Sequence, residues 1–354
     1  MSRAVYDVFR EKRVLVTGDT GFKGSWLSLW LTELGADVTG YALPAEGGQP
    51  LFDLLGLERM IRHVDGDVRD ADAMQAAFAE ARPEIVFHLA AQSLVRRSYD
   101  EPKYTFDTNV GGAVNVLEAV RATPSVRAVV CITSDKCYRN KEWVWGYREN
   151  DELGGHDPYS ASKAAAEMVI GAYITSYFHG DGAPGVASTR AGNVIGGGDW
   201  TEDRIVPDCM RALKEGAEIV LRNPDATRPW QHVLEPLSGY LLLAARMLED
   251  PGRHSGAWNF GPRPGSVRTV RELAETVVRD WGGGDIAVKR EPGDPHEATL
   301  LHLSIDKAQT GLGWSPKWDA ARTIAETVSW YRAVHDGESP VDATRRQIKA
   351  FMES

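Results

Sequence analysis

The chain has 354 residues, of which 43% are hydrophobic and 25% charged, as in a soluble globular protein of one large domain or two. Its net charge of −10 excludes a broad nucleic-acid-binding surface, which needs a basic stripe. Apolar runs such as 240–245 are far shorter than the ~20 residues of a membrane span, and residues 1–13 lack the apolar segment of a signal peptide. The three cysteines have no metal-ligand spacing, so we expect reduced thiols, no metal site and a cytoplasmic protein.

The first predicted elements indicate a dinucleotide site. A β-branched strand at 14–16 leads into the turn Gly18-Asp19-Thr20-Gly21-Phe22-Lys23-Gly24, and an amphipathic helix follows at 25–34. Glycines let the backbone approach a pyrophosphate closely, and the helix N-terminus offers free N–H groups and partial positive charge. The spacing is GxxGxxG rather than GxGxxG, so a plain tight connection is the alternative.

Strands and helices then alternate. We expect strands at 37–42, 61–64, 85–88, 128–132 and 186–189, and helices at 70–81, 109–120 and 160–178. This order predicts a doubly wound, Rossmann-type parallel sheet, whose ligands lie at the carboxyl ends of the strands. The motifs at such ends are 18–24, 67–68, 89–93 and 133–136. The second strand ends at Tyr41-Ala42-Leu43-Pro44 without an Arg, which favours NAD over NADP.

The regular alternation stops after Arg190, which predicts a smaller, mixed α/β C-terminal substrate domain. We expect a cofactor domain of residues 1–189 plus about 235–261, and a substrate domain of 190–234 and 262–354. A helix at 235–249 and a strand at 257–260 would return to the first domain, and a helix at 319–335 would close the second. The loop with Trp143, Trp145 and Tyr147 either covers a sugar or packs at the domain edge.

Tyr159 and Lys163 are the strongest candidates for chemistry. They are four residues apart in a predicted helix and therefore share one face. A phenol has a pKa near ~10, and a neighbouring ammonium lowers it by favouring the phenolate. Such a pair can take a proton from an alcohol while a hydride leaves the same carbon. Taken alone, the pattern also fits a surface Tyr and a surface Lys at a helix start.

The turn 18–24, Ser134 and the Tyr159/Lys163 pair occur in the order found in extended short-chain dehydrogenases/reductases, and nearly the whole chain resembles that family. Within it the chain is most similar to nucleotide-sugar 4,6-dehydratases that act on CDP-glucose. The cytidine nucleotide follows from the resemblance alone. The strings that carry this similarity are Gly21-Phe22-Lys23-Gly24, Thr133-Ser134-Asp135-Lys136-Cys137-Tyr138, Arg190-Ala191-Gly192-Asn193-Val194-Ile195-Gly196-Gly197-Gly198-Asp199-Trp200 and Arg228-Pro229-Trp230-Gln231-His232-Val233.

The resemblance implies an internal redox cycle with tightly held NAD. Tyr159 would deprotonate the sugar C4 hydroxyl, Lys163 would hold the ribose and Ser134 the reacting oxygen. Water would then leave across C5 and C6, with Asp135 as acid and Lys136 as base, and hydride would return to C6. In water at neutral pH a carboxyl group is deprotonated and an amine is protonated, which are the wrong states for an acid and a base. Burial would raise the pKa of Asp135 and lower that of Lys136. Which of the two holds the proton is open, and a structural ion pair is the alternative.

The resemblance also assigns binding residues and assembly. It implies a nucleotide-sugar substrate, a product for deoxysugar biosynthesis such as that of O-antigen, and a homodimer or dimer of dimers formed through the helices after Thr108 and Tyr159. A nucleotide-sugar 4-epimerase and a non-catalytic NAD-binding regulator are the alternatives. The NAD-binding residues would be Gly18, Thr20, Gly21, Phe22, Gly24, Asp67, Val68, Leu89, Ala90, Ala91, Ser93, Thr108, Tyr159 and Lys163. The substrate-binding residues would be Ser93, Arg190, Asn193, Arg204 and Arg228, where guanidinium groups match phosphate oxygens.

Overall fold

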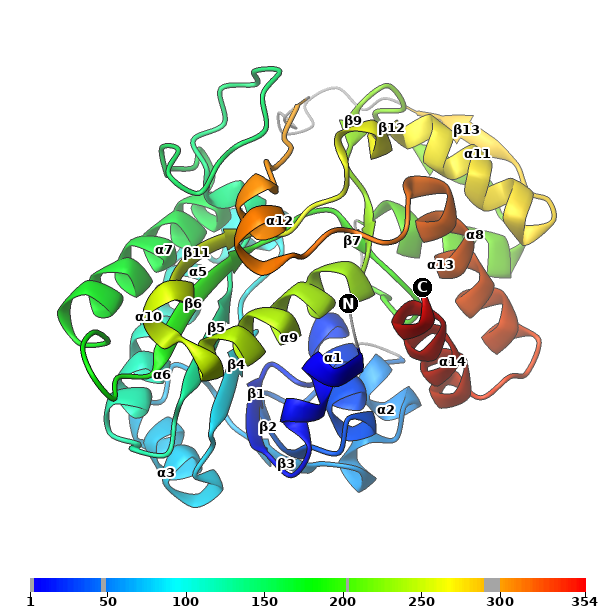
Figure 1. Ribbon diagram of the computed structural model, residues 1–354. Coiled ribbons are helices and arrows are strands. Elements are labelled where there is room, and N and C mark those ends of the chain that lie inside the picture. The colour runs from blue at the N-terminus through cyan, green and yellow to red at the C-terminus, as the bar shows by residue number, and fades with distance from the viewer. Residues whose placement is uncertain (1–2, 46–48, 202–203, 290–299) are drawn as a thin grey trace.

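The computed structural model describes residues 3–45, 49–201, 204–289 and 300–354. Its centre is a seven-stranded sheet with the strand order β11-β6-β5-β4-β1-β2-β3, in which every neighbouring pair is parallel (Figure 1). The strand order reverses between β1 and β4, which is the position where doubly wound sheets bind ligands. The strands are β1 (Arg13–Thr17), β2 (Asp37–Ala42), β3 (Arg62–Asp65), β4 (Ile85–His88), β5 (Ala128–Ile132), β6 (Gly185–Arg190) and β11 (Gly256–Asn259). The predicted α/β architecture is confirmed.

Both faces of the sheet are apolar because helices cover both. In β1, Val14 and Val16 belong to one buried cluster while Leu15 belongs to the other, as the two-residue period of a strand requires. The same alternation separates Ile85 and Phe87 from Val86 in β4, as well as the apolar residues of β5. Burial on two sides explains why these strands are continuous apolar runs in the sequence.

Helices α3, α6 and α7 lie on one face of the sheet, and α1 and α9 lie on the other (Figure 1). The helices and turns before the sixth strand are η1 (Arg3–Phe9), α1 (Phe22–Glu33), α2 (Leu51–Leu54), η2 (Leu57–Arg59), α3 (Ala71–Ala81), α4 (Val95–Asp100), α5 (Pro102–Phe106), η3 (Asp107–Gly111), α6 (Gly112–Arg121), η4 (Asp135–Cys137) and α7 (Pro158–Ser176). The segment η3 is a π-helical turn, which joins α5 to α6 without a break.

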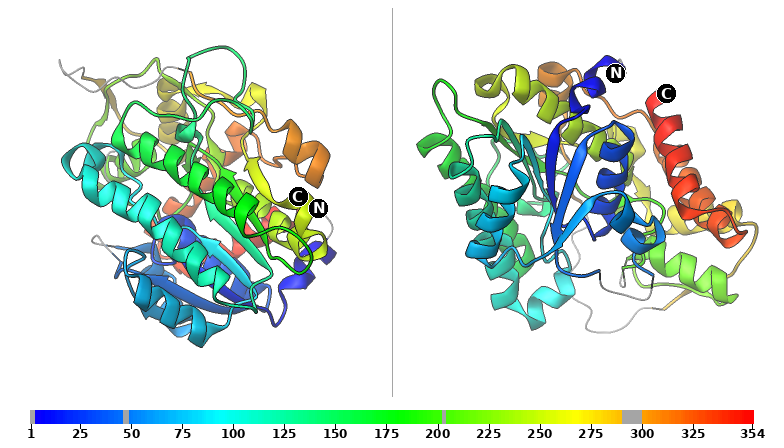
Figure 2. Two further views of the ribbon diagram at one scale, coloured as in Figure 1. Left: turned by 90° about the vertical axis from the view of Figure 1, so that its left-hand side faces the viewer. Right: turned by 90° about the horizontal axis from the view of Figure 1, so that it is seen from below.

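The C-terminal part stands over one end of the sheet, and its described residues form three two-stranded sheets (Figures 1 and 2). These pair β7 (Val194–Ile195) with β10 (Gln231–His232), β8 (Ile219–Leu221) with β13 (Ile286–Val288), and β9 (Thr227–Arg228) with β12 (Arg268–Thr269). Its helices, with those that return to the large sheet, are α8 (Ile205–Glu215), α9 (Leu234–Glu249), α10 (Pro251–His254), η5 (Pro264–Ser266), α11 (Val270–Trp281), α12 (Asp306–Leu312), α13 (Ala320–His335) and α14 (Pro340–Glu353).

Segments far apart in the sequence meet in this arrangement. The expected strand at 257–260 is β11, which pairs with β6 at the edge of the large sheet, and the expected helix at 235–249 is α9. Helix α14 packs on α1 through Phe351, whose ring lies edge-on to that of Trp30 with 5.9 Å between the ring centroids. The C-terminal helix therefore contacts a helix near the start of the chain. Within the described ranges, no helix has the length and apolar content to cross a membrane.

Candidate active site

A cavity of about 2470 Å³ opens at the carboxyl ends of the central strands and extends under the C-terminal part. This exceeds the ~300–1,000 Å³ of an ordinary small-molecule pocket, so a dinucleotide and a second ligand fit side by side. Arg190 is the single residue of the sequence-predicted set that does not line it. The predicted residues that do are Gly18, Thr20, Gly21, Phe22, Gly24, Asp67, Val68, Leu89, Ala90, Ala91, Ser93, Thr108, Ser134, Asp135, Lys136, Tyr159, Lys163, Asn193, Arg204 and Arg228.

The glycine turn after β1 fits a dinucleotide. Gly18 has a φ of +75°, and a Cβ there would lie 2.7 Å from the backbone nitrogen of Ala90. At Gly24 a Cβ would lie 2.0 Å from the Gly18 oxygen, so helix α1 can approach the strand this closely only with glycine at that position. No side chain of the described residues caps the start of α1, which leaves N–H groups for an anion. Thr108 also lines the cavity, and its buried Oγ1 has no hydrogen-bond partner among the described residues.

Helix α7 places Tyr159 and Lys163 in the wall of the cavity. The helix begins at Pro158 after the N-cap Asp157, whose carboxylate accepts hydrogen bonds from the Ser160 amide at 2.9 Å and the Ser160 hydroxyl at 2.6 Å. The Tyr159 amide donates to the Ser98 hydroxyl at 3.2 Å, which ties the first turn to α4. Both functional side chains are buried, which excludes the alternative of a surface Tyr and a surface Lys.

Burial controls the electrostatics of this pair. It raises the pKa of Tyr159 to about 12, against a hydrogen bond with Ser134 that lowers it. Burial likewise lowers the pKa of Lys163 to about 8, and the Glu167 charge opposes that shift. The sequence predicted a Tyr159 pKa below the usual value; that prediction is wrong for the ligand-free protein because desolvation outweighs the favourable contacts.

The turn that follows β5 carries the proposed elimination pair. Ser134 caps η4 by accepting from the Lys136 amide at 3.2 Å, and its hydroxyl donates to Asp135 Oδ1 at 3.1 Å. The Asp135 carboxylate is buried against Gly192, where a Cβ would lie 1.8 Å from Oδ2, and Asn193 Nδ2 donates to that oxygen at 3.4 Å. Gly192 is therefore the residue that makes room for a carboxylate in the cavity wall.

Lys136 has a different environment from Asp135. Its side chain is exposed at the cavity, so the burial expected from the sequence is absent and that expectation is wrong. Within the described part of the chain, no ion pair joins Lys136 to Asp135, which contradicts the structural ion pair considered as an alternative. Adjacent residues of a 3₁₀ turn point in different directions, which separates the two side chains.

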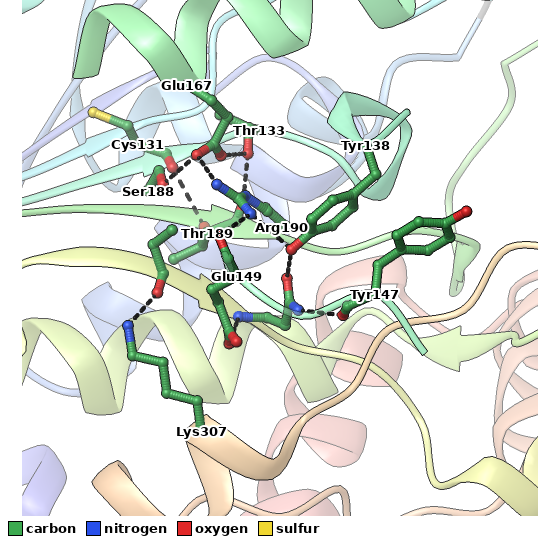
Figure 3. A network of polar contacts seen from close by, with 12 residues as sticks. Cys131, Thr133, Tyr138, Tyr147, Glu149, Glu167, Ser188, Thr189, Arg190 and Lys307 are labelled. Carbon is green, nitrogen blue, oxygen red and sulfur yellow. Dashed lines mark hydrogen bonds and ion pairs between the residues drawn. The ribbon is translucent and has the colours of Figure 1, made fainter. Parts of the chain in front are cut away.

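Arg190 corrects the predicted substrate site. Its side chain is 3% exposed, and its Nη2 forms an ion pair with Glu167 Oε2 at 2.6 Å. Its Nη1 donates to the Tyr138 hydroxyl at 2.7 Å and to the Glu149 carbonyl at 3.0 Å (Figure 3). A buried guanidinium requires a counter-charge, which Glu167 supplies in this network, and Arg190 does not line the cavity.

The other proposed phosphate ligands face the cavity. The half-exposed Arg204 guanidinium pairs with the buried Asp199 carboxylate at 3.0 Å, which fixes its orientation. Arg228 donates to the Thr227 carbonyl at 2.8 Å from strand β9. Asn193 has a φ of 52°, in the left-handed region that Asn tolerates better than most residues. All three residues belong to the part of the chain after Arg190, whereas the turn with Ser134, Asp135 and Lys136 follows β5.

Two polar residues of the site were not predicted. Lys23 lines the cavity, and its pKa is lowered to about 8, chiefly by burial and then by the Arg204 charge. Asn109 holds two walls together: its Nδ2 donates to the Gln92 carbonyl at 3.0 Å and to the Ser162 hydroxyl at 2.8 Å. Lys23 stands inside a motif that the sequence had marked for its glycines, whereas nothing in the sequence distinguishes Asn109.

The aromatic loop before α7 packs at the edge of the molecule. Trp143 stacks on Tyr147 at 5.2 Å, and Tyr147 stacks on Tyr138 at 5.1 Å. Neither Trp143, Trp145 nor Tyr147 lines the cavity. The sequence left two alternatives open for this loop. The structure supports packing at the edge and not a loop that covers a sugar.

Sequence and structure comparisons identify relatives along the whole chain. The chain is 48% identical over 348 residues to the CDP-glucose 4,6-dehydratase of Salmonella typhimurium strain LT2, covering 96% of each sequence. It is 28% identical to the dTDP-glucose 4,6-dehydratase of Xanthomonas campestris pv. campestris B100, covering 90% of this chain and 92% of that one.

Solved structures have the same fold. DesIV, a dTDP-glucose 4,6-dehydratase from Streptomyces venezuelae with NAD and TYD bound, superposes with a TM-score of 0.78 at 26% identity, covering 93% of this chain and 99% of that one. The UDP-glucose 4-epimerase of Thermus thermophilus in complex with NAD has a TM-score of 0.76 at 27% identity, covering 90% of this chain and 98% of that one. The sequence profile of the GDP-mannose 4,6 dehydratase family matches residues 15–327, and the chain belongs to this family of extended short-chain dehydrogenases/reductases.

Proposed function

We propose that this protein is an NAD-dependent hydro-lyase that converts CDP-glucose into CDP-4-dehydro-6-deoxyglucose and water. One observation carries the proposal: the turn with Ser134, Asp135 and Lys136 and the pair Tyr159/Lys163 line one cavity with the glycine turn. The relative that is 48% identical over 96% of the chain has CDP-glucose in its name, and this supports the choice of nucleotide.

The first half of the reaction uses the tyrosine and its neighbours. NAD, when bound, would supply the hydride acceptor for sugar C4 and the hydride donor for C6. Tyr159 takes the proton of the C4 hydroxyl, and Ser134, within hydrogen-bond contact of Tyr159, orients the same oxygen. The Lys163 ammonium holds the ribose and stabilises the Tyr159 phenolate as it forms. Gly18, Gly24 and Thr108 provide the close backbone approach and the hydroxyl that hold the dinucleotide.

The second half uses the turn after β5. Oxidation at C4 acidifies the C5 proton, which Lys136 removes from the exposed side of the cavity. Asp135, fixed by Ser134 and Asn193, delivers a proton to the C6 oxygen as water leaves. Arg204 and Arg228 hold the diphosphate, because a planar guanidinium matches phosphate oxygens.

A 4-epimerase uses the same Tyr, Lys and cofactor turn, and one of the structural relatives is a UDP-glucose 4-epimerase. An epimerase needs no acid and base at C5 and C6. The position of Asp135 and Lys136 in the cavity wall therefore favours dehydration. A non-catalytic regulator would have no need of the buried Tyr159/Lys163 pair.

We also infer a homodimer or a pair of dimers. The interface would be formed by the helices after Thr108 and Tyr159, which are α6 and α7. It would cover the exposed apolar side chains of Met168 on α7 and of Phe106, which lies two residues before Thr108. The three cysteines are free and buried, which supports a reducing, cytoplasmic environment.

Substrate assays test the proposed function. Pure protein is incubated with CDP-, dTDP-, UDP- and GDP-glucose, and each reaction is analysed for the 4-keto-6-deoxy product and for C4 epimers. We expect a 4-keto product from CDP-glucose. Turnover of dTDP-glucose alone would refute the cytidine assignment, and formation of an epimer without a 4-keto sugar would refute dehydration.

A further inference from the structure

A buried carboxylate lies directly behind the redox pair. Glu167 is on α7 one turn after Lys163, and both side chains point into the protein. Its Oε2 accepts from Ser188 Oγ at 2.8 Å and from Arg190 Nη2 at 2.6 Å, while its Oε1 accepts from the Thr133 hydroxyl (Figure 3). Its carboxylate is therefore fixed by strand β6 and by the residue that follows β5.

The contacts of Glu167 connect the turn of Ser134 with strand β11. Thr133 immediately precedes Ser134, so Glu167 links the end of β5 to the helix of Tyr159. On the other side, Arg190 connects through Tyr138 to Asn259 of β11, whose Oδ1 accepts from the Tyr138 hydroxyl at 2.8 Å. The network is polar and buried, and the mechanism described above does not use it.

We propose that Glu167 is a positioning residue of the redox site: its carboxylate, fixed by Thr133, Ser188 and Arg190, supplies the negative charge that faces the Lys163 ammonium. The proposal rests on the redox function proposed above. Lys163 must be charged to stabilise the Tyr159 phenolate, and burial works against that charge. Among the groups acting on Lys163, Glu167 makes the largest opposing contribution.

The other titratable groups near Lys163 do not replace this charge. Burial raises the pKa of Cys131 on β5 to about 12 and raises that of Cys137 on η4 further, so both thiols are neutral when Lys163 titrates. His88 on β4 has a pKa lowered to about 3 and is neutral as well. Tyr159 is protonated in the ligand-free protein, and the Lys23 cation on α1 repels Lys163.

A purely structural role makes a different prediction from an electrostatic one. Glu167→Gln alone leaves the Arg190 guanidinium buried without a counter-charge, so this variant loses stability for that reason. The double variant Glu167→Gln/Arg190→Met removes both charges and retains an amide that bonds Thr133 and Ser188. If Glu167 only balances Arg190, the double variant behaves like the wild type. If Glu167 acts on Lys163, the double variant folds, but its Lys163 titrates at a lower pH than in the wild type.

The direct test follows the ¹³Cε resonance of Lys163 in lysine-labelled, NAD-free protein, assigned through its absence in Lys163→Arg. We expect a midpoint near the pKa of about 8 in the wild type and a midpoint about one pH unit or more lower in the double variant. The alkaline limit of hydride transfer from CDP-glucose should move by the same amount, because the charge of Lys163 is lost at lower pH.

Glu235→Gln is the matched control. Glu235 is also a buried carboxylate, but it accepts from the Lys317 and Trp318 amides, away from the cavity, so its loss should lower the melting temperature without moving the Lys163 midpoint. An unchanged midpoint in a folded double variant overturns the inference. The titration needs no substrate, so inactivity of the wild type towards CDP-glucose would refute the proposed function and leave this result standing.

Discussion

Two neighbouring residues of one short turn have opposite environments. Asp135 is enclosed by Gly192 and hydrogen-bonded to Ser134 and Asn193, whereas Lys136 is exposed at the cavity. A proton donor to a leaving oxygen benefits from a fixed position, and a base that must reach C5 benefits from a flexible side chain. The fixed position of Asp135 and the reach of Lys136 therefore suit contact with the C6 oxygen and with C5, whereas the burial expected to put Lys136 in its basic form is absent from the ligand-free protein.

Replacing Lys136 by Ala separates oxidation from elimination. Tyr159, Lys163 and Ser134 remain, so we expect transient absorbance of reduced nicotinamide after mixing with CDP-glucose, followed by product formation reduced about 100-fold or more, as for loss of a general base. Lys103→Ala is the control, because Lys103 is an exposed lysine paired with Asp107 outside the cavity. Product formation at the wild-type rate by Lys136→Ala would remove this lysine from the mechanism.

At the scale of elements, the large sheet was predicted better than the site. Strands β2, β4 and β5 have the predicted bounds because short apolar runs between turns carry that information locally. The burial of Arg190 could not be predicted from the sequence, because its partner Glu167 lies 23 residues earlier and contacts it only when α7 packs on β6. The exposure of Lys136 and the burial of Tyr159 likewise depend on packing between elements that the sequence pattern does not specify.

The start of α7 has a testable consequence for activity. Asp157 caps the helix two residues ahead of Tyr159, so Asp157→Ala should destabilise the protein by about 1 kcal/mol and loosen the turn that carries Tyr159. We expect a lower kcat together with this loss, measured by steady-state kinetics and urea denaturation, and recovery in Asp157→Asn. Asp319→Ala removes an equivalent cap from α13 and should cost similar stability with unchanged kcat. Equal kcat in both Ala variants would contradict a link between this cap and catalysis.

For the whole molecule, the cavity depends on segments from both ends of the chain. The strand-order reversal between β1 and β4 creates the cofactor side, and the part after Arg190 supplies Asn193, Arg204 and Arg228 for the substrate side. Helices α6 and α7 lie on the opposite side of the sheet from that part (Figures 1 and 2). A second subunit can therefore pack on these helices without blocking entry to the cavity.

This geometry makes subunit association testable apart from catalysis. Met168 on α7 is 67% exposed and Phe106 on α5 is 39% exposed, so Phe106→Glu/Met168→Glu would place two charges in a proposed apolar interface. We expect a shift from dimer to monomer in sedimentation velocity at micromolar concentration. Val144→Glu is the control, since Val144 is 74% exposed on the loop before α7 and outside the proposed interface. A double variant with an unchanged sedimentation coefficient would exclude these helices as the interface, because two buried carboxylates facing apolar surface are incompatible with a stable contact.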